Sequence, residues 1–168
     1  MTADTRPEWH VYGSPDAPVT ILEFGDLECP YCRAAAGPLR ELVDTSDGRV
    51  RLVWRHFPLF EVHPYALSAA LASEAAGRHG KFWEMRDALM SDQSRLSEPD
   101  LRRAAAALGI DPAEVVGERA QALAAAVQGD YTAGIERGVR GTPTLFVNGE
   151  RFHGKVTLER LREAVDAA

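Results

Sequence analysis

The spacing of apolar and polar positions predicts that the chain opens with a strand, a helix and a second strand. Val19 to Phe24 is a short apolar and β-branched run, which predicts a buried strand. A helix is predicted from Pro30 to about Val43, and Gly37-Pro38 in its middle predicts a kink. Val50 to Phe57 alternates apolar with basic residues over most of its length, which predicts a second strand that ends at Pro58.

The middle of the chain changes to an alanine-rich, helical composition. From Pro64 to about Gly138 we expect four or five helices, separated by glycines and prolines. The segments Ser97 to Asp100 and Asp111 to Glu114 resemble capped helix starts, in which acidic side chains stabilise the positive end of the helix dipole. This helical stretch has no repeat period.

The end of the chain returns to strands and closes with a helix. Gly141 to Val147 predicts a strand, and Asn148-Gly149 after it is a strong signal for a tight hairpin turn. Glu150 to His153 is the expected return strand. A last helix is predicted from a cap at Thr157 to about Ala167, because its apolar residues fall on one face.

The composition is that of an ordinary globular protein. Of the 168 residues, 45% are hydrophobic and 26% are charged, and a domain of this size needs neither disulfides nor metals to bury its core. A net charge of −6 without a Lys/Arg cluster excludes a nucleic-acid surface. No stretch reaches the roughly 18 apolar residues of a membrane span. No dimerisation segment and no Gly-rich phosphate loop is visible, so we expect a monomer without a cofactor.

The amino terminus has no apolar core of the kind that a secretory signal requires. As written, the sequence therefore favours a cytoplasmic protein. If a signal peptide has been removed, the location would be periplasmic or otherwise extracytoplasmic. The cysteines leave both locations open, because a C-x-x-C pair serves redox chemistry on both sides of a membrane.

The most specific chemical feature is the pair Cys29 and Cys32, with Pro30 and Tyr31 between them, at a predicted helix start. This spacing brings both sulfurs onto one helical turn, within disulfide reach. We expect Cys29 to be exposed and Cys32 to be shielded. The free N–H groups and the dipole of the helix favour an anion, so we predict a lowered pKa for Cys29. Its thiolate would be both a nucleophile and a good leaving group.

Two structural uses of the cysteine pair are the alternatives. A zinc site would need two further ligands from His56, His63, His79 or His153, and no second C-x-x-C or H-x-x-x-H accompanies the pair. A purely structural disulfide that closes only four residues removes little chain entropy and stabilises little. Redox exchange explains the pair better, and we expect no metal.

The order strand, Cys-Pro-Tyr-Cys, helix, strand, helical stretch, Gly-Thr-Pro-Thr and hairpin closely resembles the thioredoxin superfamily, and within it the DsbA-like branch. The resemblance implies an α/β thioredoxin fold, with a central mixed β-sheet flanked by helices and an all-helical insertion. It divides the chain into an N-terminal extension (1–12), a core (13–62 and 140–168) and the insertion (63–139). The motif departs from the best-known DsbA pattern, which has His in place of Tyr31, and is also typical of glutaredoxins.

The resemblance also implies roles for particular residues. Thr142-Pro143 would be a cis peptide against the dithiol, where the backbone of Thr142 pairs with a substrate chain; an ordinary trans proline is the alternative. Pro30 and Tyr31 would bind the substrate together with Thr142 and Pro143. Glu23 would lie beneath Cys32 and transfer its proton. A solvent channel, or an arginine partner such as Arg55, is the alternative explanation for this buried acid.

The sequence thus predicts a protein-disulfide oxidoreductase that exchanges a Cys29–Cys32 disulfide or dithiol with protein thiols through a mixed disulfide on Cys29. Its partners would be protein thiol or disulfide substrates and a redox partner protein or small thiol. The alternatives are a glutaredoxin-like reductase of mixed disulfides with a low-molecular-weight thiol, and a non-catalytic domain that holds a partner strand. The direction of electron flow stays open.

Overall fold

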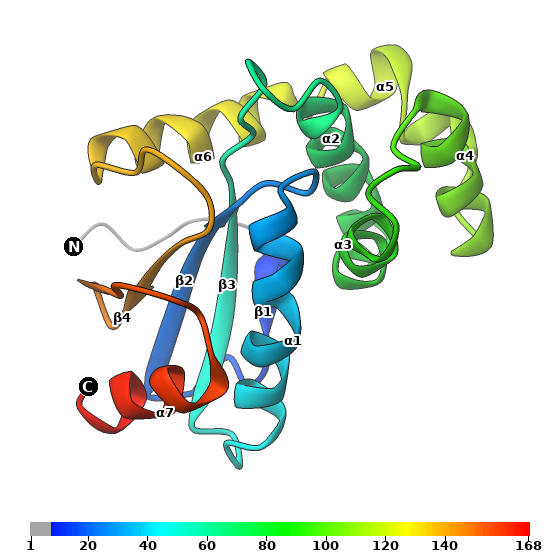
Figure 1. The fold of residues 1–168 in the computed structure, drawn as a ribbon. Helices are drawn as coiled ribbons and strands as arrows, with labels where there is room; N and C mark the ends of the chain where they lie inside the picture. Colours follow the sequence, from blue (N-terminus) through cyan, green and yellow to red (C-terminus); the bar gives the residue numbers. More distant parts are fainter. Residues whose placement is uncertain (1–7) are drawn as a thin grey trace.

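Five strands form one mixed sheet in the order β1-β3-β2-β4-β5 (Figure 1). The computed structural model describes residues 8–168, so most of the predicted N-terminal extension, and the start of the chain on which the location was predicted, lie outside the described residues. β2 and β3 are parallel, and the other pairs are antiparallel. The strands are β1 (Val11–Tyr12), β2 (Val19–Gly25), β3 (Val50–His56), β4 (Thr144–Val147) and β5 (Glu150–Arg151).

Helices cover both faces of this sheet, and further helices gather at one end of it (Figure 1). They are α1 (Pro30–Asp44), α2 (Ala66–Gly77), α3 (Phe82–Ser91), α4 (Glu98–Ala107), α5 (Gly117–Gln121), α6 (Ala124–Glu136) and α7 (Leu158–Asp166), with short 3-10 turns η1 (Glu8–His10) and η2 (Pro112–Glu114). From β2 onward the predicted order of strands and helices is confirmed, and so is the thioredoxin fold with its helical insertion.

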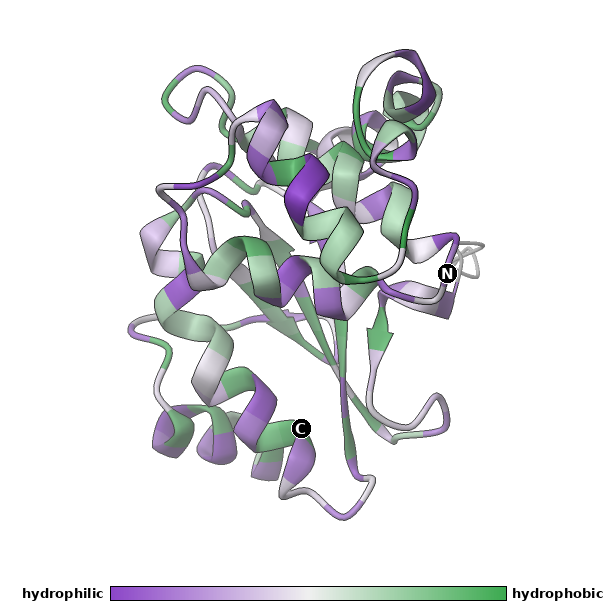
Figure 2. Ribbon diagram, turned by 90° about the vertical axis from the view of Figure 1, so that its right-hand side faces the viewer, coloured by the Kyte–Doolittle hydropathy of each residue, from purple (hydrophilic) through white to green (hydrophobic). Residues whose placement is uncertain are grey.

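The alternation of side chains along β2 divides the core between the two faces of the sheet. Ile21 packs with residues of α1 and α7, whereas Phe24 packs with Phe57 and with residues near α6, as expected for neighbours of opposite parity in a strand. Gly134 of α6 lies so close to this second face that a Cβ would stand 2.6 Å from the Phe57 ring. Figure 2 shows the apolar strands between the helices.

A third part of the core joins the insertion to the start of α1. Cys29 and Cys32 share one buried cluster with apolar side chains of α2, α3 and α4. The inserted helices therefore form one wall of the cysteine site and are not a separate unit beside it. This packing is the feature of the fold that matters most for the site.

Some local predictions were wrong or incomplete. β1 was not predicted, although it pairs antiparallel with β3 through Val11 and Val53. Asp111 caps only a 3-10 turn, accepting a hydrogen bond from the N–H of Ala113 at 3.0 Å. The return strand ends at Arg151, two residues earlier than expected. In contrast, the caps at Ser97 and Thr157 are confirmed.

The hairpin turn at Asn148-Gly149 has the backbone that its sequence predicts. Both residues have positive φ angles, 46° and 88°, which is the combination that a two-residue hairpin turn requires. Among residues 8–168, no helix combines the length and the apolar character needed to cross a membrane.

Candidate functional site: a buried dithiol

The dithiol lies at the first turn of α1. Cys29 is the N-cap residue, with extended backbone angles, and Pro30 follows as the first helical residue. The N–H of Arg33 donates to the Cys29 carbonyl at 3.1 Å and closes the first helical turn. The helix start therefore falls where Pro30 predicted it, because a proline there gives up an N–H that no carbonyl would have accepted.

Both cysteines are free thiols and both are buried. Cys32 has no exposed surface, and only 2% of Cys29 is exposed. The prediction that Cys29 is exposed was therefore wrong. Two distant segments cover it: its sulfur lies 3.5 Å from the Thr142 carbonyl, and the Gln93 amide donates to the carbonyls of Leu27 and Cys29, each at 2.9 Å.

The surroundings drive the pKa values of the two thiols in opposite directions. The pKa of Cys29 is lowered to about 5, because the Cys32 thiol donates to its sulfur and outweighs the cost of burial, with help from Thr142 and from the N–H groups of Tyr31 and Cys32. The pKa of Cys32 is raised well above that of a free cysteine by burial and by its bond to Cys29. The prediction of one acidic and one shielded thiol agrees with this geometry.

A shallow groove of about 310 Å³ runs beside the dithiol. The peptide bond between Thr142 and Pro143 is cis, and both residues line the groove. So does Tyr31, which is 73% exposed. Of the residues predicted to bind substrate, Pro30 alone does not line it. The lining residues are Tyr31, Ala34, Ala35, Thr142, Pro143, Gly154, Lys155 and Val156.

Glu23 is fully buried on β2, and its partner is not Arg55, the arginine that the sequence suggested as an alternative. Its Oε2 accepts from the Arg86 guanidinium of α3 at 3.3 Å, whereas Arg55 pairs with Asp130 at 3.5 Å. The register explains the difference, because Glu23 aligns with Trp54 and Arg55 aligns with Phe24 on the other face.

The charge on Glu23 is only partly compensated. Its Oε1 has no hydrogen-bond partner in the described chain. Burial raises the pKa of Glu23 to about 7 even though Arg86 lowers it. The negative charge of the Cys29 thiolate also raises the pKa of Glu23. The negative charge of Glu23 in turn raises the pKa of Cys32. The acid is therefore coupled to the dithiol, and it ionises near neutral pH.

Asp26 belongs to the site but was not among the predicted site residues. Its backbone N–H donates to the Cys32 sulfur at 3.4 Å, while its buried carboxylate accepts from the N–H of Glu28 at 2.8 Å. The same carboxylate accepts from the N–H of Leu59 at 2.9 Å and pairs with His63 at 2.8 Å. The local signal was available, since an Asp that bonds the N–H two residues on is a common loop motif.

A second buried polar cluster lies between η1, β3 and α2. Glu74 Oε1 pairs with Nε2 of His10 and, at 2.8 Å, with Nε2 of His56, and all three residues are at most 2% exposed. The Trp54 indole N–H donates to His56 Nδ1 at 3.1 Å, so His56 carries its proton on Nε2. With both nitrogens engaged, His56 offers no lone pair to a metal, and the cluster is a hydrogen-bonded one.

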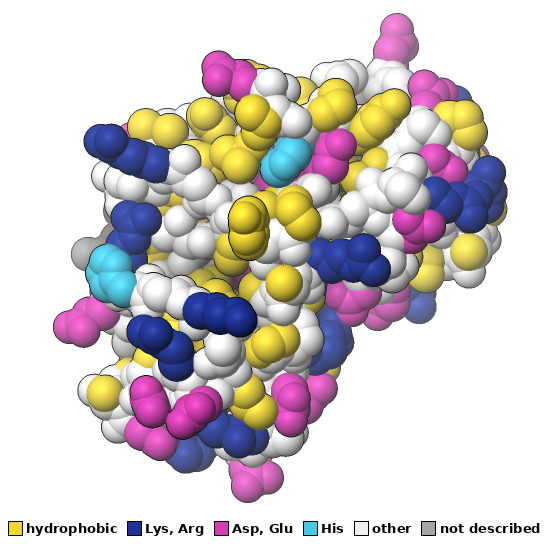
Figure 3. All heavy atoms as spheres, in the orientation of Figure 1, with side chains coloured by type: hydrophobic (Ala, Val, Ile, Leu, Met, Phe, Trp, Pro, Cys, Tyr) yellow, Lys and Arg dark blue, Asp and Glu magenta, His cyan; other side chains and the backbone are white. Residues whose placement is uncertain are grey.

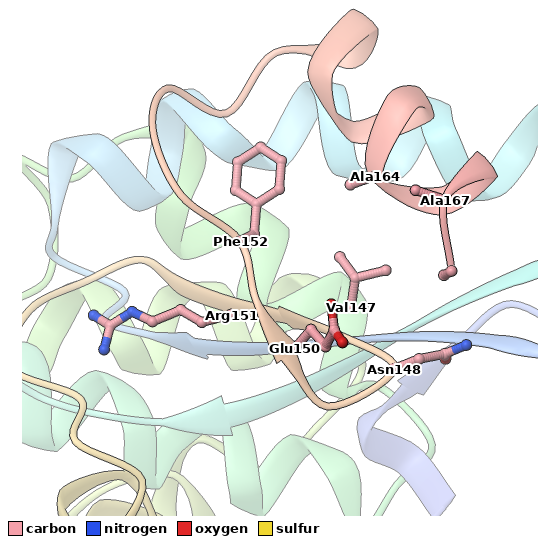
Figure 4. Close-up of a pocket in the computed structure, with 8 residues that line it drawn as sticks. Val147, Asn148, Glu150, Arg151, Phe152, Ala164 and Ala167 are labelled. Atoms are coloured by element: carbon pink, nitrogen blue, oxygen red, sulfur yellow. The ribbon is translucent and has the colours of Figure 1, made fainter.

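Another hollow, of about 360 Å³, lies between the β4–β5 hairpin and the end of α7 (Figure 4). Val147 and Phe152 extend toward α7, and Arg151 points away. None of the predicted site residues lines this hollow, and we assign it no role.

A family model described as thioredoxin matches residues 5–167. The chain therefore belongs to the thioredoxin family. The solved structures that share its fold include DsbA proteins.

Three solved structures illustrate this likeness. A thioredoxin-like oxidoreductase from Silicibacter pomeroyi is 29% identical, with a TM-score of 0.80, over 96% of both chains. BdbD from Bacillus subtilis is 23% identical, with a TM-score of 0.84, over 94% of this chain and 91% of that one. DsbA2 from Pseudomonas aeruginosa is 26% identical, with a TM-score of 0.71, over 94% and 92%. Together they support a thiol-disulfide oxidoreductase in general.

Curated relatives carry a different name. The chain is 46% identical over 162 residues to a Na(+)/H(+) antiporter NhaA 1 of Salinispora arenicola, and 47% identical over 161 residues to NhaA 3 of Salinispora tropica. These matches cover 95% of this chain but 24% of each antiporter. The chain thus spans about a quarter of the length of these relatives, and the likeness says nothing of cation transport by this chain.

Proposed function

We propose that the chain exchanges a Cys29–Cys32 disulfide with protein thiols through a mixed disulfide on Cys29. The observation that carries this proposal is the position of the Cys29 sulfur at the N-cap of α1, where the Cys32 thiol and two backbone N–H groups stabilise its thiolate. A stabilised thiolate is a good leaving group, and an acidic thiol favours the reduced form of the couple. We therefore favour oxidation of protein thiols as the working direction.

The exchange takes two steps. A substrate thiolate attacks the Cys29 sulfur of the disulfide, the Cys29–Cys32 bond breaks, and Cys32 leaves with the electron pair and takes up a proton. A second substrate thiolate then attacks the substrate sulfur of the mixed disulfide and displaces Cys29 as a thiolate. The substrate is oxidised to a disulfide, and the chain keeps both electrons as a dithiol.

Glu23 is the proposed source of the proton that Cys32 takes up. The acid is buried beside the dithiol, and its pKa of about 7 lets it give or accept a proton near neutral pH. In the reverse direction, the same carboxylate would accept the proton that Cys32 must lose before it attacks. Arg86 would hold the carboxylate in place.

The groove beside Thr142 and Pro143 is the proposed position of the substrate chain. Its lining is mainly apolar and backbone, with Tyr31 at one side, so it suits an extended segment with an apolar side chain near the reacting cysteine. An enzyme that oxidises protein thiols works where disulfides persist, and we therefore propose an extracytoplasmic location.

The test uses the oxidised chain and a reduced, unfolded protein that has one pair of cysteines. We expect the wild type to convert that pair to a disulfide and Cys29→Ser to be inactive. When Cys32→Ser is instead given the oxidised form of the same protein, Cys29 should attack its disulfide, release one substrate thiol and accumulate as a mixed disulfide. An inactive wild type, or an active Cys29→Ser variant, would overturn the proposal. Full activity of Cys32→Ser with a low-molecular-weight thiol alone would favour the glutaredoxin-like alternative.

A further inference from the structure

The segment 59–65, between β3 and α2, is tied to the residues that precede the dithiol. The Asp26 carboxylate accepts from the N–H of Leu59 and pairs with His63, and the Glu28 carboxylate accepts from the N–H of Tyr65 at 2.8 Å. A substitution in this segment therefore acts directly on the loop that leads into Cys29.

His63 connects this buried loop to solvent. The side chain of Asp26 has no exposed surface, whereas that of His63 is 20% exposed. Phe60 and Val62 of the same segment are exposed apolar side chains, and Figure 3 shows hydrophobic side chains gathered over the upper part of this face. His63 can therefore exchange protons with water while it contacts a buried carboxylate.

The groups that face His63 are mainly negative. The carboxylate of Asp26 is in contact with His63 at 2.8 Å, and the Asp26 carbonyl accepts from the N–H of Cys29 at 3.1 Å. The charges of Cys29 and Glu28 also raise the pKa of His63. Burial lowers the pKa of His63, but the hydrogen bond and the charge of Asp26 outweigh it and raise the pKa above its ordinary value. Because an interaction between two charges is mutual, an imidazolium at this position must also stabilise the Cys29 thiolate.

We propose that His63, held by Asp26, is a positioning residue whose positive charge stabilises the Cys29 thiolate and makes the reactivity of the dithiol depend on pH. Neither Pro30 nor Tyr31, the two residues between the cysteines, can carry a positive charge. The positive charge near Cys29 therefore comes from His63, in a distant segment of the chain. The proposal deepens the proposed function and rests on it for its biological meaning.

The physical consequence is a second titration in the behaviour of Cys29. While His63 is protonated, the thiolate is stabilised and is a weaker nucleophile. When His63 loses its proton, the thiolate loses a favourable charge, and its nucleophilicity rises, since nucleophilicity increases with thiol basicity. The rate of Cys29 alkylation should therefore rise twice as pH increases.

The experiment measures the alkylation rate of Cys29 in the reduced chain from about pH 4 to about pH 9, a range that covers both titrations. The wild type should show one inflection near 5, from Cys29, and a second one above the ordinary histidine pKa. His63→Asn keeps an amide donor for Asp26 but cannot ionise. The comparison is made with Glu23→Gln as the shared background, because Glu23 also titrates near 7 and is coupled to Cys29. There, His63→Asn should lose the second inflection, and its first should move up by as much as about one pH unit.

Two further variants separate a charge effect from a structural one. His79→Asn removes another histidine that pairs with an acid, Glu114, at the surface, and its profile should match the wild type. Asp26→Asn keeps the hydrogen-bond acceptor and the size of the side chain but removes its charge. Because that charge raises the pKa of His63, the second inflection should move to lower pH. If His63→Asn keeps both inflections at their wild-type positions, or if Asp26→Asn leaves the second in place, the proposal is wrong.

Alkylation requires no protein substrate, so this result is independent of exchange activity. The chain could fail to oxidise protein thiols and still show two inflections, with the second one lost in His63→Asn. That result would contradict the proposed function but not the role of His63. Normal thiol oxidation with a single inflection in the wild type would sink the role of His63 alone.

Discussion

Two buried glutamates in this fold have opposite electrostatic environments. Glu23 on β2 and Glu74 on α2 are both at most 2% exposed. One oxygen of Glu23 contacts a single cation at 3.3 Å and the other has no partner in the described chain, and burial raises its pKa to about 7. Burial also acts on Glu74, but hydrogen bonds from His10 and His56 outweigh it and hold its pKa well below the ordinary range.

The comparison shows that burial alone does not decide what an acid does. One oxygen of Glu74 accepts from two histidines, so this acid keeps its charge at any ordinary pH and joins η1, β3 and α2. Glu23 lacks a hydrogen-bond partner for one oxygen within the described chain. Its protonation state can therefore change near neutral pH, beside the two cysteines. Perturbed acids of this second kind are the ones expected at functional sites. Substitutions at Glu74, Glu23 and Arg86 test this division.

Removal of the Glu74 carboxylate should have the largest effect, and it should fall on stability. In Glu74→Ala, the His10 and His56 donors lose the oxygen that accepts from both, and unsatisfied buried groups cost about 1–3 kcal/mol each. We expect the free energy of unfolding in denaturant to fall by about 3 kcal/mol. Exchange activity per folded molecule should stay normal; a stable but inactive variant would contradict the division.

Glu23→Gln should instead reduce exchange activity and leave stability largely unchanged. The amide keeps the size and an acceptor for Arg86 but cannot transfer a proton, and a lost general acid or base typically slows a step about 100-fold. The attack of Cys32 on the mixed disulfide should slow by about this factor. A rapid-quench experiment measures that rate. The alkylation rate of Cys29 should change far less. An unchanged resolution rate would leave Glu23 with no catalytic role.

Arg86 should set the pH at which Glu23 works. Its guanidinium is buried between the rings of Trp54 and Trp83, 4.7 and 5.0 Å from their centroids, and it lowers the pKa of Glu23. In Arg86→Met, the midpoint of the resolution step against pH should therefore rise by about one unit. Arg86→Lys keeps the charge and should shift the midpoint less. Equal midpoints in all three proteins would show that Arg86 has only a packing role.

The charge on Glu74 should add a smaller, acid-sensitive contribution to stability. Because the pKa of Glu74 is lower in the folded chain than its ordinary value of 4.5, its contribution is present above that value and is lost as pH falls through the folded pKa. Glu74→Gln keeps the shared oxygen, so it should cost only about 1 kcal/mol at neutral pH. Its stability should also fall less steeply in acid, which denaturant melts at several pH values would reveal.

The sequence predicted what depends on near neighbours, and it missed what depends on packing between distant segments. Pro30 after Cys29 marked the helix start, because that signal is local. The arginine beside Glu23 comes from α3, 63 residues away, and nothing in the local pattern identifies Arg86. Arg55 was excluded by the two-residue period of β3, which turns it toward α6. The burial of Cys29 likewise depends on Thr142 and on the insertion.

The most direct test of the account is a pH titration of the reduced chain followed by the ultraviolet absorbance of the thiolate, with Cys29→Ser as the blank. In the wild type a thiolate should form with a midpoint of about 5, and this transition should be missing from the blank. A midpoint near the ordinary cysteine value of about 8.5, or the same transition in Cys29→Ser, would contradict it.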